Sequence, residues 1–315
     1  MKQIPIIDTH CDIVIPYQEL KNKFGNTSSS TQTNLPLLKA ANVKIIFAGF
    51  SYDDLLGNTD QQFKNIHQMI KRYSDDFELI NDFNQIEQIL NSNKIGVIIH
   101  LEGAAILDNK IDKLTYFYNM GLRSLGFTHN TKNCLGTGAL VDDKQGLTPF
   151  GKEVIKKCNE LNIIIDLAHL NRAGFDDVIK LSLKPPFISH GNCYSLTKNP
   201  RNYTDQQLRK IAKLGSVVGI FFSGKFLKRD NNPTGPELAD AIAHIKHIVK
   251  TIGINHVVLG CDFGGITTGL PKGLENHSSL ITLFAKLRKE NFSNKDIEKI
   301  AYKNALRIIK EYAKK

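Results

Sequence analysis

Histidine and acidic residues recur where apolar segments of this 315-residue chain end. The residues at or beside these ends are His10 with Asp12, Glu102, His129, His169, His190 and Asp262. Imidazole and carboxylate groups are the donors that zinc and similar divalent transition ions bind in proteins. We therefore expect these residues to form a metal site assembled from segments that lie far apart in the sequence.

The first apolar segment carries two of these residues, His10 and Asp12, on either side of Cys11. Side chains two positions apart on a strand point to the same face, so His10 and Asp12 can converge on one ion. By the same parity Cys11 points away from them, and Cys261 points away from Asp262. We interpret both cysteines as small buried apolar residues and not as ligands.

Glu102 lies midway in the chain between this first pair and the later histidines His169 and His190. A carboxylate in that position can bridge two metal ions roughly 3.5–4 Å apart, an arrangement that clamps a hydrolytic water. Asp262 follows the last apolar segment and is the candidate base that takes a proton from this water. The residues alone thus predict a two-metal hydrolytic site.

A single histidine at a strand end is more often structural than a ligand, so the prediction depends on the joint pattern. Buried ionisable groups are costly unless they are paired or bound to metal, and chance would not concentrate them at the ends of apolar segments. We expect His100 in the core, Asp166 in a structural role and His277 solvated in a rim loop. The remaining histidines are expected to serve the fold or face solvent, and they are His67, His244, His247 and His256.

The strands that must position these residues are predicted by apolar runs rich in Ile, Val and Phe, which are typical of buried parallel strands. The eight runs are Ile4–His10, Val43–Phe50, Ile95–Glu102, Leu122–His129, Ile163–His169, Pro186–His190, Ser216–Phe222 and His256–Asp262. Eight strands alternating with helices at this chain length predict an α/β fold, a closed (β/α)8 barrel of the TIM-barrel, metal-dependent hydrolase type. Active sites of such barrels form at the carboxyl ends of the strands, where the candidate residues fall.

Segments with helical periodicity separate these strands. They are Leu35–Ala41, Asp60–Tyr73, Asn84–Leu90, Lys110–Met120, Pro149–Leu161, Arg172–Leu181, Thr204–Leu214, Pro236–Ile252, Ser278–Glu290 and Ser293–Lys314. Thr148 before Pro149, and Thr204 with Gln207 three residues on, are typical of helix N-termini. Two polar stretches, Asn26–Asn34 and Gly224–Pro236, are expected to be long loops. Because no boundary divides the chain, we expect one catalytic barrel domain over residues 1–315.

Composition and charge narrow the remaining classes of protein. The chain has 41 Lys and Arg against 31 Asp and Glu, but no nucleic-acid-binding motif accompanies the formal charge of +10. No apolar run approaches the roughly 20 residues of a membrane-spanning helix, and the N-terminus does not resemble a signal peptide. The five cysteines form no CxxC pair. We therefore expect a protein of the reducing cytoplasm with neither nucleic acid nor membrane as partner.

Longer stretches around these residues resemble the membrane (renal) dipeptidase family, zinc peptidase family M19, and in particular its bacterial members. The resemblance runs in order through essentially the whole chain. The matching stretches are DTHCD (8–12), QTNLPLLKAANV (32–43), HLEGA (100–104), GLRSLGFTHN (121–130), GLTPFGKEVI (146–155), IIDLAHL (164–170), ISHGNCYSL (188–196), NPRNYTDQQL (199–208), LGCDFGG (259–265) and AYKNALRII (301–309).

This resemblance implies a barrel enzyme with two zinc ions per subunit that hydrolyses the peptide bond of dipeptides through a metal-bridging hydroxide. Matched motif by motif, His10 and Asp12 would hold one zinc ion, and His169 and His190 would hold the other. Glu102 would bridge the two ions.

The resemblance also assigns three residues that act on the substrate. Asp262 would be the catalytic acid and base, and His129 would polarise the scissile carbonyl. Arg201 would contact the substrate, since an arginine can bind a free carboxylate through two parallel hydrogen bonds. Members of the family commonly pair, which implies a homodimer.

Three positions depart from the pattern usual in the family, and they concern substrate preference more than metal chemistry. Cys11 replaces a common asparagine, Asn34 a usual aspartate and Gly264 a second aspartate found in many members. One alternative is a binuclear-metal barrel amidohydrolase acting on another small amide, ester or lactam. Another is a binding protein with a decayed site. The His-x-Asp pattern of the first strand favours the dipeptidase, and the complete ligand set argues against decay.

Overall fold

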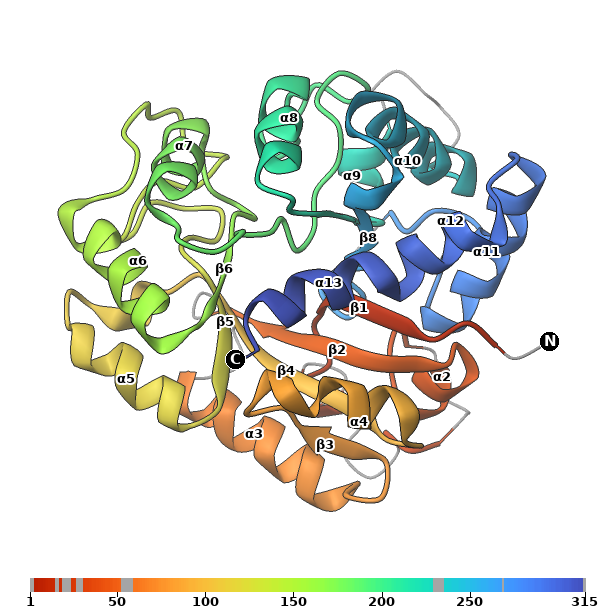
Figure 1. Ribbon diagram of the computed structural model, residues 1–315, viewed down its shortest axis with the longest axis horizontal. Coiled ribbons are helices and arrows are strands. Elements are labelled where there is room, and N and C mark those ends of the chain that lie inside the picture. Colours follow the sequence, from red (N-terminus) through yellow and green to blue (C-terminus); the bar gives the residue numbers. More distant parts are fainter. Residues whose placement is uncertain are drawn as a thin grey trace.

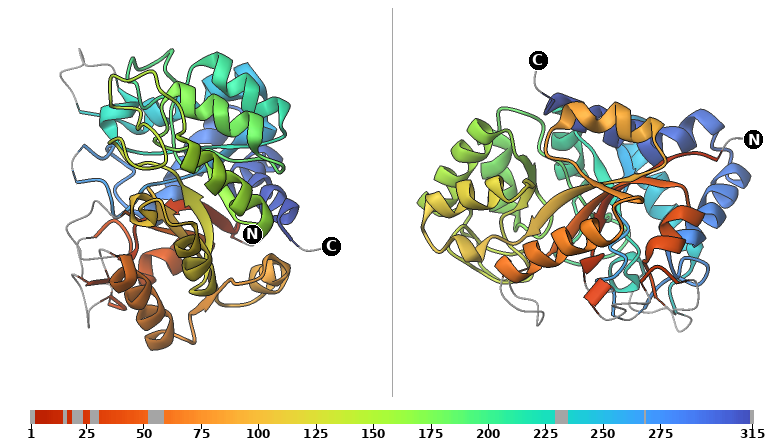
Figure 2. Two further views of the ribbon diagram at one scale, coloured as in Figure 1. Left: turned by 90° about the vertical axis from the view of Figure 1, so that its left-hand side faces the viewer. Right: turned by 90° about the horizontal axis from the view of Figure 1, so that it is seen from below.

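Parallel strands curl around a common axis, and helices cover the outside of the ring they form (Figures 1 and 2). The computed structural model describes residues 3–14, 17–18, 24–26, 31–51, 59–228, 235–267 and 269–313. The strands are β1 (Ile6–Cys11), β2 (Val43–Phe50), β3 (Phe77–Leu79), β4 (Ile95–Glu102), β5 (Leu122–Gly126), β6 (Ile164–Asp166), β7 (Val218–Ile220) and β8 (Val257–Leu259). Their apolar, largely β-branched sequences suit strands that are buried on both faces.

The pairing of the strands closes the ring. Along the sheet the order is β6-β5-β4-β2-β1-β8-β7, with every ladder parallel. Between β6 and β7, single bridges join Asp166 to Phe187 and Ile188 to Val218. The predicted (β/α)8 barrel is therefore confirmed, although the predicted strand Pro186–His190 contributes only these two bridges.

Two further differences concern the strands. The strand β3 was not predicted. It pairs with the first residues of β4, and β5 pairs with the later residues along the same edge of β4. Four predicted strands, β5 to β8, end earlier than expected, because their last residues leave the ladder and turn over the rim of the barrel. His129 and His169, for example, follow β5 and β6 by three residues each.

The helices follow the predicted alternation. They are α2 (Leu35–Ala40), α3 (Thr59–Arg72), α4 (Ile86–Asn91), α5 (Ile111–Asn119), α6 (Pro149–Leu161), α7 (Arg172–Leu181), α8 (Asp205–Lys213), α9 (Gly224–Leu227), α10 (Leu238–Ile252), α11 (Leu280–Lys289), α12 (Asn294–Glu298) and α13 (Asn304–Glu311). The Thr148 side chain caps α6, and Thr204 forms a capping box with Gln207 on α8. The predicted helix Ser293–Lys314 is instead α12 and α13 joined by a π-helical turn, and residues 314–315 lie outside the described part.

The two predicted long loops are only partly described. Gly224–Pro236 begins with the short helix α9, which corrects the prediction, and residues 229–234 lie outside the description. In Asn26–Asn34, residues 27–30 lie outside it as well, and Asn34 caps α2 by accepting a hydrogen bond from the Leu37 amide. None of the helices traced in the described ranges is long and apolar enough to cross a membrane.

The amino end of the barrel is closed by apolar packing. α13 crosses this end (Figure 1), and its Ile308 and Ile309 join the same buried cluster as Ile7, Phe47 and Val258 from the strands. Burying these side chains contributes roughly 1.5–3 kcal/mol each. The ionisable residues are left to the opposite end, where the strands finish.

Candidate active site

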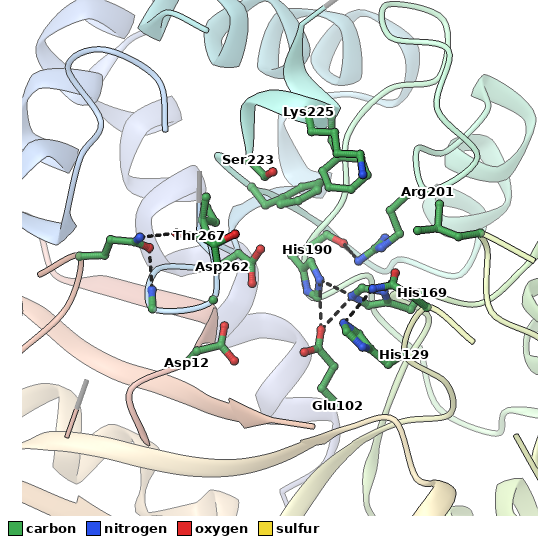
Figure 3. A pocket seen from close by; sticks show the side chains of 18 of the residues that line it. Asp12, Glu102, His129, His169, His190, Arg201, Ser223, Lys225, Asp262 and Thr267 are labelled. Carbon is green, nitrogen blue, oxygen red and sulfur yellow. Dashed lines mark hydrogen bonds and ion pairs between the residues drawn. The ribbon is translucent and has the colours of Figure 1, made fainter. Parts of the chain in front are cut away.

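A cavity of about 990 Å³ opens at the carboxyl ends of the strands. Its lining includes Asp12, Glu102, His129, His169, His190, Arg201 and Asp262. Figure 3 shows Asp12 and Asp262 on one side, the three histidines on the other, and Glu102 between them. His10 lies at the base of this group, fully buried. The chain folding thus brings together all the residues that the sequence predicted for the site.

Glu102, the last residue of β4, is the common neighbour of the imidazoles. Its Oε1 atom lies 2.9 Å from Nε2 of His169, 3.3 Å from Nε2 of His190 and 3.5 Å from Nε2 of His10. Burial favours the protonated acid, but the positive charge of His10 holds the pKa of Glu102 well below 4.5. A buried carboxylate held in its charged form is suited to bind cations.

His169 and His190 present unprotonated nitrogens to Glu102 and to each other. Nδ1 of His169 donates to Oδ1 of Asn130 at 3.0 Å. The Ser189 hydroxyl donates to Asp166, so Nδ1 of His190 donates to the Ser189 Oγ at 2.9 Å. Both Nε2 atoms therefore carry lone pairs, although they lie only 3.0 Å apart. Lone pairs and a carboxylate oxygen that converge in this way fit a cation placed among them.

Burial is the main cause that lowers the pKa of both histidines well below 6.5. A second cause for His169 is the positive charge of Arg201, and for His190 it is that of His10. The two imidazoles are therefore neutral over the physiological range, which is the form that binds metal.

His10, Asp12 and Asp262 form the other side of the site, where β1 and β8 end. Nε2 of His10 lies 3.6 Å from Oδ2 of Asp12 and 3.6 Å from Oδ1 of Asp262. Donors that surround a tetrahedral zinc ion at about 2.1 Å are about 3.4 Å apart, which matches these separations. Neither ring nitrogen of His10 has a hydrogen-bond partner among the described residues.

The charges on this side also favour a cation. Although burial works in the opposite direction, the carboxylates of Glu102, Asp12 and Asp262 raise the pKa of His10 well above 6.5. Burial, and then repulsion by Asp12, raises the pKa of Asp262 well above 3.8. The imidazole of His10, which lacks a hydrogen-bond partner among the described residues, and the neighbouring carboxylates of Asp12 and Asp262 together fit a divalent metal ion.

The backbone makes room for these side chains at specific positions. A Cβ on Gly49 would lie 2.7 Å from Cε1 of His10, so only glycine leaves space for the ring. A Cβ on Gly265 would collide with the carboxylate of Asp12. His169 and Asp262 adopt left-handed backbone angles, with φ of 65° and 60°, which are uncommon for residues other than glycine and occur at functional sites.

His129 and Arg201 lie further up the cavity wall. Nε2 of His129 accepts a hydrogen bond of 3.1 Å from Nδ2 of Asn130, and its ring centre lies 4.5 Å from that of His169. The Arg201 side chain is only 2 % exposed, and its guanidinium donates to the carbonyl of His190 at 3.2 Å. Its other terminal nitrogen has no partner among the residues described.

Some residues near the site were missed or misjudged from the sequence. Asn130 and Ser189, which orient the two histidines, gave no signal beyond their positions next to predicted ligands. His277 was expected to be solvated, but it is fully buried and donates to Asp8 at 2.9 Å. The predictions that His100 lies in the core and that Asp166 has a structural role are confirmed. Both residues are fully buried, and Nε2 of His100 lies 3.4 Å from Oδ2 of Asp166.

The other histidines serve the fold or the surface, as expected. His244 is buried and contacts the backbone of Cys193 and Leu227, and His247 pairs with Asp205 at the surface. His67 and His256 contact backbone carbonyls. His244 and His247 therefore face different partners and do not share a metal site.

The sequence model of one family, membrane dipeptidase (peptidase family M19), matches residues 1–315. An uncharacterized dipeptidase of Schizosaccharomyces pombe is 30% identical over 343 residues, covering 98% of this chain and 81% of its own length. The crystal structure of dipeptidase AC, an M19 metallopeptidase, superimposes with a TM-score of 0.90 at 24% identity, over 99% of both chains. A Rhodobacter sphaeroides metallopeptidase, bound to a phosphinate mimic of the dipeptide L-Ala-D-Ala, gives 0.89 at 24% identity, over 99% of this chain and 100% of that one.

Proposed function

Because the chain belongs to the membrane dipeptidase family and is a hydrolase that acts as a metallo-dipeptidase, we propose that it cleaves dipeptides with two zinc ions. His10 and Asp12 would hold one ion and His169 and His190 the other, with Glu102 shared between them. The observation that supports this most strongly is the position of Glu102 Oε1, within 3.5 Å of three imidazole Nε2 atoms. Zinc bound there would act as a Lewis acid and lower the pKa of water to about 7.

Asp262 is the base in this proposal. Its carboxylate lines the cavity beside Asp12, and burial raises its pKa well above 3.8, closer to the range that suits proton transfer near neutral pH. Asp262 takes a proton from the attacking water as the new C–O bond forms. It returns that proton to the leaving nitrogen as the C–N bond breaks, so the products are two free amino acids.

His129 is proposed to stabilise the charge that develops on the scissile carbonyl. Because Nε2 of this ring accepts from Asn130, the ring proton of the neutral imidazole resides on Nδ1 and is free to be donated. A preorganised donor of this kind stabilises the oxyanion of the tetrahedral intermediate. Asn130 contacts His169 as well, and so it fixes the polarising histidine relative to a metal ligand.

Arg201 is proposed to bind the carboxylate at the C-terminus of the dipeptide. One of its guanidinium nitrogens is buried at the cavity without a partner among the described residues, and a buried donor of this kind needs an acceptor. Lys225 lies above Arg201 on the cavity wall and adds a second positive charge (Figure 3). These cations favour short substrates with a free C-terminus over the interior of longer chains.

The test is a panel of dipeptides assayed with quantified metal. We expect hydrolysis of L,L- or L,D-dipeptides that is lost on chelation and restored by zinc, and little hydrolysis of C-terminally amidated dipeptides. Asp262→Asn is expected to retain both metal ions while kcat falls by about 10²–10⁴-fold. Full activity in Asp262→Asn would contradict the role of the base. Preferential turnover of a lactam or ester would favour the wider amidohydrolase alternative.

We also propose a compartment, a domain organisation, an oligomeric state and partners for the enzyme. The five cysteines are all free, which suits a reducing cytoplasm, and no disulfide links any described segments. We propose that residues 1–315 act as one catalytic domain, that two subunits pair, and that small dipeptides, and not nucleic acid or membrane, are its partners. Light scattering of the purified enzyme measures the pairing directly.

A further inference from the structure

Asp166, at the end of β6, organises one side of the site from below. Its fully buried Oδ1 accepts hydrogen bonds from the Ala168 amide at 3.0 Å and the Ser189 amide at 2.8 Å. Its Oδ2 accepts from the Ser189 hydroxyl at 2.5 Å, and that hydroxyl accepts in turn from Nδ1 of His190. One carboxylate therefore joins two rim segments and orients a metal-ligand candidate.

Asp8, on β1, makes the same contacts on the opposite side of the barrel. Its fully buried Oδ1 accepts from the His10 amide at 3.2 Å and the Cys261 amide at 2.9 Å. As with Asp166, one donor lies two residues further along the chain and the other belongs to the neighbouring strand segment. The first donor is the backbone amide of the site residue His10 itself. The second belongs to Cys261, which directly precedes the site residue Asp262.

The third partner distinguishes Asp8 from Asp166. Oδ2 of Asp8 accepts from Nε2 of His277, which comes from the segment before α11, 269 positions further along the chain. His277 is fully buried, its ring packs edge-on against Phe263 at 4.9 Å, and its amide donates to the carbonyl of Gln32 at 3.1 Å. His277 thereby connects the segments after β1 and β8 with the one before α11.

This group is not a third metal site, although Asp8, Cys261 and His277 offer ligand atoms within 4.8 Å of one another. Both oxygens of Asp8 are already occupied by three N–H donors. Burial, and then the charge of Asp8, raises the pKa of the Cys261 thiol well above 9.0, so the sulfur is a protonated thiol and not a thiolate. The geometry is that of a hydrogen-bonded support.

We propose that the Asp8–His277 pair positions the metal-ligand candidate His10, together with the candidate base Asp262 beside it, as the Asp166–Ser189 pair positions His190. The two pairs are positioning residues: they act through the backbone or through a neighbouring side chain and do not touch the substrate. This inference rests on the proposed two-metal function, but it predicts an affinity for metal and not a rate of hydrolysis. Outer hydrogen bonds of this kind typically change metal affinity by about 10–100-fold.

The experiment titrates metal-free full-length protein with zinc in competition with a chromogenic chelator. Two variants remove the contact from opposite sides: His277→Leu loses the donor, and Asp8→Asn turns an amide N–H₂ towards His277 while its oxygen still accepts from both backbone amides. His277→Gln restores a donor. Ser189→Ala is the matched variant of the other pair. The visible spectrum of bound cobalt reports the geometry of each metal equivalent.

We expect His277→Leu and Asp8→Asn to bind one metal equivalent about 10–100-fold more weakly and the other with unchanged affinity. Ser189→Ala is expected to weaken the opposite equivalent, and His277→Gln to remain within about threefold of the wild type. Unchanged affinities in whichever of the first two variants folds would overturn the inference. The inference would also be overturned if these variants lost affinity equally for both metal equivalents and the metal-free protein melted at a lower temperature. Normal metal binding without dipeptide hydrolysis would contradict the proposed function and leave this result standing.

Discussion

The two sides of the cavity hold their metal-ligand candidates by different means. On the β6 side, the imidazoles of His169 and His190 each have a side-chain partner on Nδ1, Asn130 at 3.0 Å and Ser189 at 2.9 Å. On the β1 and β8 side, neither ring nitrogen of His10 has a hydrogen-bond partner among the residues described. His10 is held instead through its backbone amide, by the steric fit of its ring and by the surrounding charges.

This difference separates preorganisation from electrostatic attraction. A histidine with an Nδ1 partner has its tautomer and ring orientation set before a metal ion arrives. The ring of His10 lacks this constraint, and the crowded carboxylates of Asp12 and Asp262 repel each other until a cation lies between them. We therefore expect the β6 side to bind metal more tightly, and the β1 and β8 side to depend more on pH and on small displacements.

The largest effect is expected where the two sides meet, at Glu102. Glu102→Gln removes the charge that both sides share, so metal binding weakens on both and kcat falls by more than about 1,000-fold. Metal content and dipeptide turnover measure this result. Glu78→Gln, which alters a carboxylate paired with Lys94 away from the cavity, is the control and should behave as the wild type. Retention of two tightly bound ions in Glu102→Gln would show that the sides do not share this residue.

The next effect tests the preorganised side alone. Asn130→Ala removes the acceptor for Nδ1 of His169 and the donor to His129, and the tighter metal equivalent should weaken by about 10–100-fold. Competition with a chelator measures the affinity. Asn159→Ala serves as the control, because this half-buried asparagine hydrogen-bonds to the backbone of Leu181 and Leu183 and does not line the cavity. If instead only the weaker equivalent changed, the assignment of the tighter ion to the β6 side would be wrong.

A smaller effect is expected from displacing His10. In Gly49→Ala the new Cβ would lie 2.7 Å from the His10 ring, which must move, and the weaker equivalent should lose about tenfold in affinity. Gly235→Ala is the matched control, because nothing lies within 4 Å of a Cβ at that position. Equal affinities in Gly49→Ala and the wild type would show that the position of His10 does not limit metal binding.

The smallest effect concerns pH and the metal-free protein. Burial and Asp12 raise the pKa of Asp262 above 3.8, so protonation of Asp262 stabilises the folded state. This stabilisation is complete below pH 3.8 and is lost as the pH rises through the raised pKa of the folded protein. Melting temperatures of metal-free protein should therefore decline less towards neutral pH in Asp262→Asn than in the wild type, by about 2–4 °C. Identical pH profiles would contradict the raised pKa.

The candidate ligands could be placed together from the sequence because their positions obey local rules. Parity along one strand places His10 and Asp12 on the same face, and parallel strands bring Glu102 and Asp262 to the same end of the barrel. The strands Val43–Phe50 and Ile95–Glu102 were predicted to the residue, since continuous apolar runs mark them clearly. These parts of the fold follow from the local sequence pattern and do not depend on contacts between distant segments.

The remaining features depend on contacts between distant segments. His277 is buried because Asp8, 269 positions earlier, offers a carboxylate oxygen, and nothing near it in the sequence indicates this partner. The segment Pro186–His190 looks like a strand but forms only two bridges, because Ser189 and His190 turn to meet Asp166 and Glu102. The π-helical turn at Lys299–Lys303 likewise lies within a helical pattern that gives no sign of it.

In the proposed function, two metal ions that share Glu102 support dipeptide hydrolysis. The most direct measurement titrates the metal-free enzyme with zinc while following hydrolysis of a dipeptide such as L-Ala-L-Ala. We expect negligible turnover without zinc and maximal turnover once two equivalents are bound, with the second equivalent binding more weakly than the first. Full turnover in the metal-free enzyme, or none with two equivalents bound, would contradict it.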